Sequence, residues 1–271
     1  NPEYNPNISV RDEHLFLEAS RLAYADRDFF VADPEFFTVP VDSLLNKGYL
    51  KGRSKIINEK LATKRIGRGN PIEYIKNNLS RGINLEAPST THISIVDYEG
   101  NAVALTSSIE FAFGSGKNVG GFFLNNQLTD FSFSYRDEEN NIIANSVKAK
   151  KKPRSSMAPT LVFKNNQLIG VLGSPGGSRI ICYVAKTLYY LIEFNMHLNK
   201  VIELPHLCSR GSSSEIEISE NGNYLSSELV LMGHNVKKKE MNSGLNIIWR
   251  EKNNWMGVSD FRREGVAIGF E

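Results

Sequence analysis

The stretch Ser89-Thr90-Thr91-His92-Ile93-Ser94-Ile95-Val96-Asp97 decides how this chain is interpreted. It follows a polar segment and then alternates apolar and polar side chains, as a half-buried β-strand does. Thr90 stands at the start of that predicted strand. A threonine hydroxyl becomes a nucleophile when a base takes its proton, and the α-amino group of an N-terminal threonine is such a base. Because Thr90 is internal, this chemistry requires the Ser89–Thr90 bond to break first; otherwise Thr90 is an ordinary β-branched strand residue.

The residues after this strand predict a β-hairpin. Tyr98-Glu99-Gly100-Asn101 supplies turn residues, and the alternation of apolar and polar side chains resumes after it. The register places Thr90 opposite about Ile109, which Ser108 and Glu110 flank. We therefore expect a hydroxyl and a carboxylate beside the candidate nucleophile.

A second stretch, Gly173-Ser174-Pro175-Gly176-Gly177-Ser178-Arg179, connects a predicted strand to an apolar helix. The N–H groups of Gly176 and Gly177 could stabilise an oxyanion at the start of that helix. The alternative is a tight turn that needs small residues. A second predicted hairpin, with strands over 159–163 and 168–172, ends at this stretch, and its register, when extended, brings Ser155 and Ser156 near it. A hydroxyl nucleophile with N–H groups that could stabilise an oxyanion is the combination that acyl transfer requires, so these residues indicate an acyl-transfer reaction.

Composition excludes several other classes of protein. The 271 residues are 41% hydrophobic, enough for one large domain or two small ones, and the net charge of +2 gives no basis for nucleic-acid binding. No apolar stretch approaches the roughly 20 residues of a membrane-spanning helix. Cys182, Cys208 and the histidines lack metal-ligand spacing, so we expect no metal and no cofactor; a disulfide stays open. Because the chain begins with Asn1, we expect a processed protein or a fragment.

Periodicity predicts several helices and three hairpins. Helical patterns cover residues 12–23, 47–61, 179–194 and 198–203, and Asp12 is the expected N-cap of the first. The hairpins are the two described above and one over residues 245–259. This mixture indicates antiparallel sheets covered by helices, an α+β fold.

Six motifs in order resemble one family. They are Thr90-Thr91-His92 through Asp97, Glu99-Gly100-Asn101-Ala102-Val103, Phe113-Gly114-Ser115-Gly116, Leu124-Asn125-Asn126-Gln127 with Asp130-Phe131, Pro153 to Thr160, and Gly173 to Ile180. Upstream, Leu22-Ala23-Tyr24-Ala25-Asp26-Arg27 also matches, as does Ser259-Asp260-Phe261-Arg262-Arg263-Glu264-Gly265 downstream. On these motifs the chain resembles the γ-glutamyltransferases of the N-terminal-nucleophile hydrolase superfamily.

The resemblance implies a four-layer αββα sandwich and a precursor that cuts itself before the nucleophile. Residues 1–89 would be the C-terminal part of the large-subunit segment and residues 90–271 the small, catalytic subunit, both within one αββα domain. The enzyme would take a γ-glutamyl group from glutathione or a related amide onto Thr90 and pass it to water or an amino acid, without a cofactor.

Site residues follow from the same motifs. Thr90 would be the nucleophile and Ser89–Thr90 the cleavage site, Ser108 would orient the nucleophile, and Gly176 with Gly177 would form the oxyanion hole. The expected substrate-binding residues are Glu110, Gln127 and Asp130 for the α-amino group, and Ser155 and Ser156 for the α-carboxylate. The family's arginine for this carboxylate has no counterpart here. Arg154, where the family more often has leucine, would alter substrate preference or point to solvent.

The implied partners are a γ-glutamyl substrate such as glutathione, an acceptor amino acid or water, and the remaining large-subunit portion of the precursor. A periplasmic or secreted location is expected from the resemblance alone. Two alternatives stay open. One is a related acylase or poly-γ-glutamate hydrolase or transpeptidase, and the other is an unprocessed homologue that binds without turnover.

Overall fold

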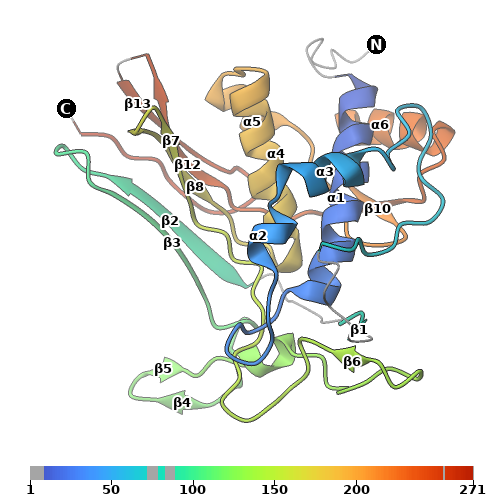
Figure 1. Cartoon of the computed structure of the whole chain (residues 1–271). Coiled ribbons are helices and arrows are strands. Elements are labelled where there is room, and N and C mark those ends of the chain that lie inside the picture. Colours follow the sequence, from blue (N-terminus) through green and yellow to red (C-terminus); the bar gives the residue numbers. More distant parts are fainter. Residues whose placement is uncertain (1–8, 72–78, 83–88, 253, 271) are drawn as a thin grey trace. The chain divides into compact units, whose positions relative to one another are not determined.

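The computed structural model describes residues 9–71, 79–82, 89–252 and 254–270 (Figure 1). The chain divides into two compact units, and each unit combines three separate stretches of sequence. Unit 1 consists of Asn1–Leu85, Leu128–Ser155 and Leu207–Lys239, and unit 2 consists of Glu86–Gln127, Ser156–His206 and Glu240–Glu271. Both units therefore contain residues from either side of the predicted cleavage site.

Unit 2 is built on a four-stranded antiparallel sheet in the order β13-β12-β8-β7. Its strands are β7 (Thr160–Lys164), β8 (Gln167–Gly173), β12 (Asn246–Glu251) and β13 (Asn254–Ser259). The turn between β7 and β8 places Asn165 and Asn166 at positive φ, which asparagine tolerates better than most residues. The sequence predicts both hairpins of this sheet, and the structure confirms them.

A second hairpin, β2 (Thr90–Val96) and β3 (Ala102–Ser108), packs against this sheet. Its inward face carries His92 and Ser94, and the Ser94 hydroxyl donates to the Asn246 carbonyl at 2.9 Å. The outward face is apolar. The side chains of this outward apolar face are each about half exposed: Ile93, Ile95, Val103 and Leu105.

Helices cover the sheet of unit 2 on the side away from the hairpin (Figure 1). A short 3-10 helix, η2 (Gly177–Arg179), leads into α4 (Ile180–Glu193), which α5 (Leu198–Glu203) follows. Tyr183 and Tyr190 of α4 are almost fully buried. The predicted apolar helix over 179–194 is therefore confirmed within one residue at each end.

Unit 1 is organised around the long helix α1 (Val10–Phe30). A three-stranded sheet in the order β11-β10-β9 and helix α6 pack against it. Their bounds are β9 (Leu207–Ser209), β10 (Ser214–Glu217), α6 (Glu220–Leu231) and β11 (Val236–Lys239). One buried cluster joins them, formed by Leu17, Leu207, Ile216, Leu225 and Leu229.

Two details of unit 1 differ from the sequence-based expectation. Ser9, not Asp12, is the N-cap of α1. Its hydroxyl oxygen accepts the Asp12 N–H at 3.2 Å, and the Asp12 carboxylate in turn accepts the Ser9 N–H. The predicted helix over 47–61 ends early, as α3 (Lys47–Ser54). Asn58 accepts the N–H groups of Lys60 and Leu61, and this local turn competes with a helix.

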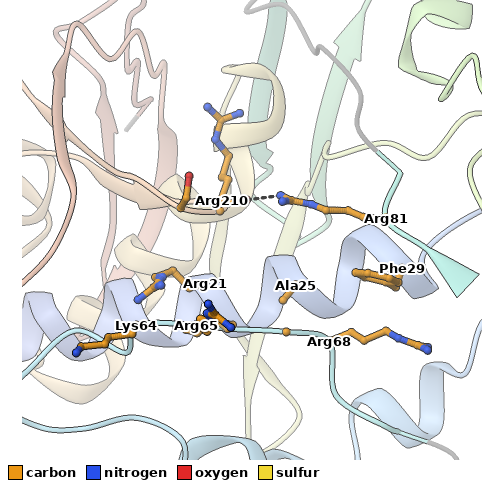
Figure 2. Close-up of a pocket in the computed structure, with 12 residues that line it drawn as sticks. Arg21, Ala25, Phe29, Lys64, Arg65, Arg68, Arg81 and Arg210 are labelled. Atoms are coloured by element: carbon orange, nitrogen blue, oxygen red, sulfur yellow. Dashed lines mark hydrogen bonds between the residues drawn. The ribbon is translucent and has the colours of Figure 1, made fainter. Parts of the chain in front are cut away.

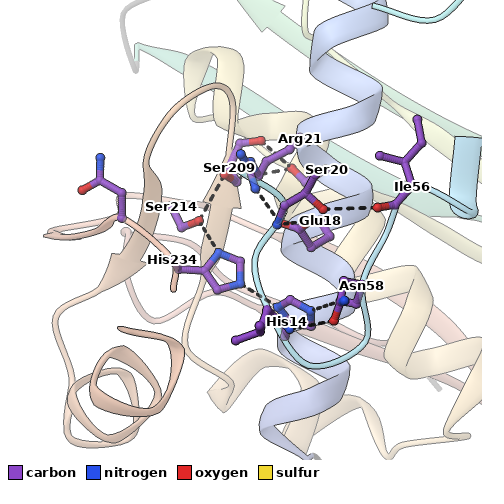
Figure 3. A network of polar contacts seen from close by, with 12 residues as sticks. His14, Glu18, Ser20, Arg21, Ile56, Asn58, Ser209, Ser214 and His234 are labelled. Atoms are coloured by element: carbon purple, nitrogen blue, oxygen red, sulfur yellow. Dashed lines mark hydrogen bonds and ion pairs between the residues drawn. The ribbon is translucent and has the colours of Figure 1, made fainter. Parts of the chain in front are cut away.

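A buried histidine pair connects several segments of unit 1 (Figure 3). His14 Nδ1 lies 2.7 Å from His234 Nε2, and His14 Nε2 lies 2.7 Å from the Asn58 carbonyl. A carbonyl only accepts, so His14 donates from Nε2 to Asn58. On its other side, His234 Nδ1 lies 3.1 Å from the Ser214 hydroxyl oxygen. The pair and its partners therefore connect α1, the segment around Asn58, β10 and the segment between α6 and β11.

The remaining elements are short. They are α2 (Val41–Leu44), β1 (Leu79–Ser80), β4 (Asn118–Val119), β5 (Phe122–Phe123), η1 (Gln127–Asp130) and β6 (Ile142–Ile143). Strand β1 pairs with β6 in parallel, and β4 pairs with β5 as a small hairpin. Within the described ranges, no helix combines the length and the apolar composition that crossing a membrane requires.

Candidate active site

Thr90 is the first residue of β2, and the hairpin register sets its neighbour. The predicted partner was about Ile109; the observed partner is Ser108, one position away. Thr90 Oγ1 lies 3.2 Å from Ser108 Oγ, and Thr90 is 6% exposed. A buried hydroxyl at a strand end therefore has a second hydroxyl beside it, in a position to fix its rotamer.

Ser108 is also bonded to the residue that follows the hairpin. Its hydroxyl oxygen accepts the Glu110 N–H at 2.9 Å. Glu110 has φ of 73°, in the left-handed region that disfavours side chains with a Cβ. The chain therefore turns sharply after β3, and Glu110 lies buried at the same end of the hairpin as Thr90.

Gln127 is brought to Glu110 by a closed loop. The Phe111 N–H donates to Asn126 Oδ1 at 2.9 Å, and the Asn126 N–H donates to the Ile109 carbonyl at 3.2 Å. These two bonds join the ends of the loop that carries β4 and β5. Gln127 Nε2 then lies 3.4 Å from Glu110 Oε2. Two of the predicted substrate-binding residues are thus neighbours.

The Gly176-Gly177 turn has positive φ at both positions, and Gly176 cannot carry a Cβ. The two φ angles are 137° and 59°, and a Cβ on Gly176 would lie 2.5 Å from Tyr183 Cε2. Both main chains are buried where β8 gives way to η2 and α4. The tight-turn interpretation is therefore correct for the geometry, and it leaves an oxyanion-binding role open, because the turn also opens a helix.

His92 is a structural residue, not a base for Thr90. Its Nδ1 lies 2.7 Å from Thr106 Oγ1 and its Nε2 lies 3.1 Å from Ser94 Oγ, so both ring nitrogens have partners. Burial lowers the pKa of His92 to about 4. Gly173 leaves room for the ring: a Cβ there would lie 2.3 Å from His92 Cε1.

Comparison with known proteins fixes the family. The sequence model described as Gamma-glutamyltranspeptidase matches residues 3–270, almost the whole chain. The chain belongs to the γ-glutamyltranspeptidase family. Among curated relatives, the glutathione hydrolase proenzyme of Bacillus subtilis (strain 168) is 36% identical over 267 residues, covering 94% of this chain and 44% of the relative. The chain thus spans less than half the length of that relative.

Solved structures agree with this γ-glutamyltranspeptidase assignment. A mutant γ-glutamyltranspeptidase from Helicobacter pylori is 33% identical with a TM-score of 0.56, covering 64% of this chain and all of that one. A cephalosporin acylase from Bacillus halodurans has a TM-score of 0.80 at 23% identity, covering 99% of this chain and 47% of that one. At that identity the acylase supports the fold alone. These comparisons therefore establish that the chain has the mixed α and β fold that these solved structures share.

A residue that the sequence analysis did not place in the site contacts Thr90. Arg263 Nη1 donates to the Thr90 carbonyl at 3.0 Å, and Nη2 lies 3.4 Å from the Asn242 carbonyl. Gly244 lies between Arg263 and Pro175, since a Cβ on it would be 3.1 Å from Arg263 Cδ and 2.7 Å from Pro175 Cγ. These contacts connect the start of β2 with the segment before Gly176.

A buried polar network holds the segment that carries Arg263. Asp260 accepts from the Ser243 hydroxyl and from the N–H groups of Leu245 and Arg262, and His206 Nε2 lies 2.7 Å from Ser243 Oγ. Burial alone would raise the pKa of Asp260, but its contacts with His206, Ser243 and Arg262 hold that pKa well below its ordinary value. Ser243 is fully buried and bonded to Asp260, so this serine–histidine–aspartate group is structural and not a catalytic triad.

The other predicted site residues are divided between the two units. Ser156 is buried in unit 2. Asp130 and Ser155 belong to unit 1, where Asp130 is buried and its carbonyl accepts from Asn145 Nδ2 at 2.7 Å. Ser89 precedes β2 directly. The grouping of Asp130 and Ser155 with Thr90 stays a prediction.

The expectation that Arg154 points to solvent is wrong. Its guanidinium is 1% exposed and lies 3.4 Å from Asp28 Oδ1. It also donates to the carbonyls of Arg27, Asp28 and Gly82. Two of these carbonyls lie in the last turn of α1, where a cation is favourable. Arg154 therefore ties the end of α1 to residue 82.

Acidic residues, histidines and cysteines do not gather as a metal site in the described part of the chain. No group of three or more of these side chains is placed to hold an ion. What the site offers chemically is a threonine hydroxyl, a serine hydroxyl and a carboxylate at one end of a hairpin.

Proposed function

We propose that this chain is the catalytic part of a γ-glutamyltransferase and hydrolase that cleaves itself at Ser89–Thr90. The observation that carries the proposal is the pairing of the Thr90 and Ser108 hydroxyls, 3.2 Å apart, at the start of β2 in a chain of this family. The names of the relatives, glutathione hydrolase proenzymes, support glutathione as the substrate and a precursor as the starting form.

Self-cleavage requires an exchange of one bond for another. Thr90 Oγ1 attacks the Ser89 carbonyl carbon, the C–N bond breaks, and an ester joins the two pieces. Water then hydrolyses the ester, which leaves a carboxylate on Ser89 and a free α-amine on Thr90. Ser108 and Arg263 would hold the attacking residue, the first through its hydroxyl and the second through its carbonyl.

The mature enzyme would use the new α-amine as the base. It takes the proton of Thr90 Oγ1 as the oxygen attacks the γ-carbonyl carbon of glutathione. The γ-amide bond breaks, the protonated amine of the cysteinylglycine part leaves, and a γ-glutamyl ester forms on Thr90. Water or the amine of an acceptor amino acid then takes the γ-glutamyl group and restores the hydroxyl. The N–H groups of Gly176 and Gly177 would stabilise each oxyanion.

Substrate binding would rest on charge complementarity. The Glu110 carboxylate, with Gln127 3.4 Å away, suits the α-ammonium group of the γ-glutamyl substrate, and Asp130 would add a second anion. The hydroxyls of Ser155 and Ser156 would bind the α-carboxylate.

The outward apolar face of the hairpin supports the four-layer sandwich and a further part of the precursor. Ile93, Ile95, Val103 and Leu105 form a continuous strip, because Ile93 pairs with Leu105 and Ile95 with Val103. Such a strip on a folded protein is ordinarily covered. The remaining large-subunit portion would supply the covering layer, and residues 1–89 and 90–271 would share one αββα domain.

The first experiment is the intact mass of the purified full-length protein with wild-type, Thr90→Ala and Thr90→Ser sequences. Wild type is expected as two pieces that meet at Ser89/Thr90, the alanine variant as one chain, and the serine variant as slowly cut, since its hydroxyl is retained. The cut wild type should hydrolyse glutathione. An uncut and inactive wild type would overturn the proposal in favour of a homologue that only binds.

A further inference from the structure

A basic hollow of about 510 Å³ lies in unit 1, formed entirely by residues of that unit (Figure 2). Four parts of the chain form it: helix α1, the segment 64–68, Arg81 directly after β1, and the turn between β9 and β10. Six cationic side chains line it, and these are Arg21, Lys64, Arg65, Arg68, Arg81 and Arg210. The site proposed above uses none of them.

Half of these cations are already paired. Arg21 contacts Glu18 at 2.6 Å, Arg81 contacts Asp28 at 2.8 Å, and Arg210 contacts Glu215 at 2.8 Å. Lys64, Arg65 and Arg68 are exposed, and over the described ranges no ion pair engages them. Three positive charges without an ion pair in the described part of the chain therefore line one hollow. Like charges so arranged repel one another, and a bound anion relieves that repulsion.

The segment that carries these three cations is held in place by buried groups. At one end the Thr63 N–H donates to Glu18 Oε2 at 3.0 Å, and at the other the Gly69 N–H donates to Asp26 Oδ1 at 2.6 Å. Arg53 donates to the Gly67 carbonyl at 2.9 Å. These three hydrogen bonds fix the main chain of 63–69 along α1. The positions from which Lys64, Arg65 and Arg68 extend are therefore fixed as well.

The wall beside the cations is apolar. Phe29 and Ala25 of α1 line the hollow together with Ile66. The guanidinium of Arg68 lies 5.2 Å from the centre of the Phe29 ring, which restricts its orientation. A ligand here would place its charged groups toward Lys64, Arg65 and Arg68 and a less polar part against α1.

We propose that this hollow binds a small polyanion, a molecule with two or more phosphate or carboxylate groups. Guanidinium groups bind both kinds of group through paired hydrogen bonds. The volume suits a small molecule and not a polymer. The chain's net charge of +2 also provides no broad basic surface of the kind that a nucleic acid needs.

Calorimetric titration of the full-length protein with inorganic triphosphate tests this site, and citrate serves as a second probe. One saturable site is expected at low salt, weakened at high salt by screening. The double variant Lys64→Gln/Arg65→Gln should bind at least about tenfold more weakly, because two charged contacts are lost. The charge-matched control Lys51→Gln/Lys55→Gln, on exposed residues of α3 and its end, should bind within about twofold of wild type.

The outcomes separate cleanly. Binding of citrate as well as triphosphate would assign carboxylates and phosphates to the site, and binding of triphosphate alone would assign phosphates. Absence of saturable binding of either probe to wild type, or equal affinity of the two double variants, would overturn the proposal. Glutathione hydrolysis, measured in parallel, should be unchanged in both variants, and its absence would bear on the proposed function alone.

Discussion

The hydroxyl of Ser108 lies between two groups that the proposed chemistry needs, the Thr90 hydroxyl and the Glu110 main chain. Ser108→Ala removes both contacts, so self-cleavage and glutathione hydrolysis should each slow by about tenfold or more. Ser108→Thr keeps the hydroxyl and should retain most of both rates. Timed intact-mass spectra and turnover with glutathione measure them. An alanine variant with wild-type rates would remove Ser108 from the site.

Arg263 acts on Thr90 through the main chain. Arg263→Gln would lose the charged hydrogen bond to the Thr90 carbonyl, and we expect slower self-cleavage by about tenfold, because the attacking residue is less well held. Arg263→Lys should recover part of the rate. The fraction of uncut chain over time gives the result, and normal cutting in the glutamine variant would show that this contact is dispensable.

Residue-scale prediction from the sequence succeeds where contacts are local. The partner of Thr90 follows within one position from a hairpin whose turn is visible in the sequence. Arg263 is 173 positions from Thr90, and only the folded chain brings them together. The expectation that Arg154 points to solvent failed for a related reason, because its partners Asp28 and Gly82 lie far from it along the chain.

At the scale of elements, β2 can pack on β8 because Gly173 of β8 has no side chain. Gly173→Ala would place a Cβ 2.3 Å from His92 Cε1, and His92 is held on both ring nitrogens, so something must shift. We expect a loss of about 1–3 kcal/mol in the free energy of unfolding.

Gly52→Ala is the matched control for that change. Gly52 lies in α3, and a Cβ added there would have no atom within 4 Å, so alanine should be neutral or slightly stabilising. Urea denaturation of both variants makes the comparison. Equal effects would show that the hairpin can move away from the sheet at little cost.

The histidine pair makes the stability of α1 and its neighbours depend on pH. Burial, with the nearby His14, lowers the pKa of His234 from 6.5 to about 4, Arg21 acting in the same direction and Glu18 against it. Between these two pKa values the unfolded chain binds a proton on His234 and the folded chain does not. Stability is therefore complete above about pH 6.5 and falls as the pH drops toward 4, by on the order of 3 kcal/mol for this residue.

Urea denaturation at a series of pH values across that window tests this expectation. His92 titrates in the same direction, so the wild type should show the sum of the two losses. The variant His234→Asn should show a smaller dependence on pH than wild type. A free energy of unfolding that stays constant from about pH 7 to about pH 4 would contradict it.

Elements were predictable where their signals lie within a few residues. The hairpins follow from alternation and turn residues, and α4 follows from its continuous apolar sequence. The early end of α3 does not follow in this way. The Asn58 turn is local, but the prediction gave more weight to the helical pattern, and the contact of Thr63 with Glu18 of α1 is visible only in the folded chain. The N-cap of α1 was predicted three residues late, at Asp12, because Asp12 is the N3 residue of the capping box that Ser9 opens.

At the scale of the whole molecule, composition left open one large domain or two small ones, and the structure divides into two units. No local pattern could reveal that each unit is interleaved, because the division depends on which distant segments pack together. The apolar outward face of the hairpin is different, since the alternation of β2 and β3 already places Ile93, Ile95, Val103 and Leu105 on one side.

The core of unit 1 is drawn from both sides of the Ser89–Thr90 bond. Leu17 comes before it, and Leu207, Ile216, Leu225 and Leu229 come after it. Once the bond is cut, this core is shared by two polypeptides with no peptide link between them. Refolding of the cut protein should then be second order in concentration, whereas the uncut Thr90→Ala variant should refold at a rate independent of concentration.

Refolding from urea at two protein concentrations, with recovery of native circular dichroism as the signal, distinguishes these kinetics. Equal rates for the cut protein at both concentrations would show that the pieces never separate. If the orders differ as expected, the cut is a one-way step in assembly. The native pair would then persist through slow dissociation, and once unfolded in dilute solution its two polypeptides would rarely meet again.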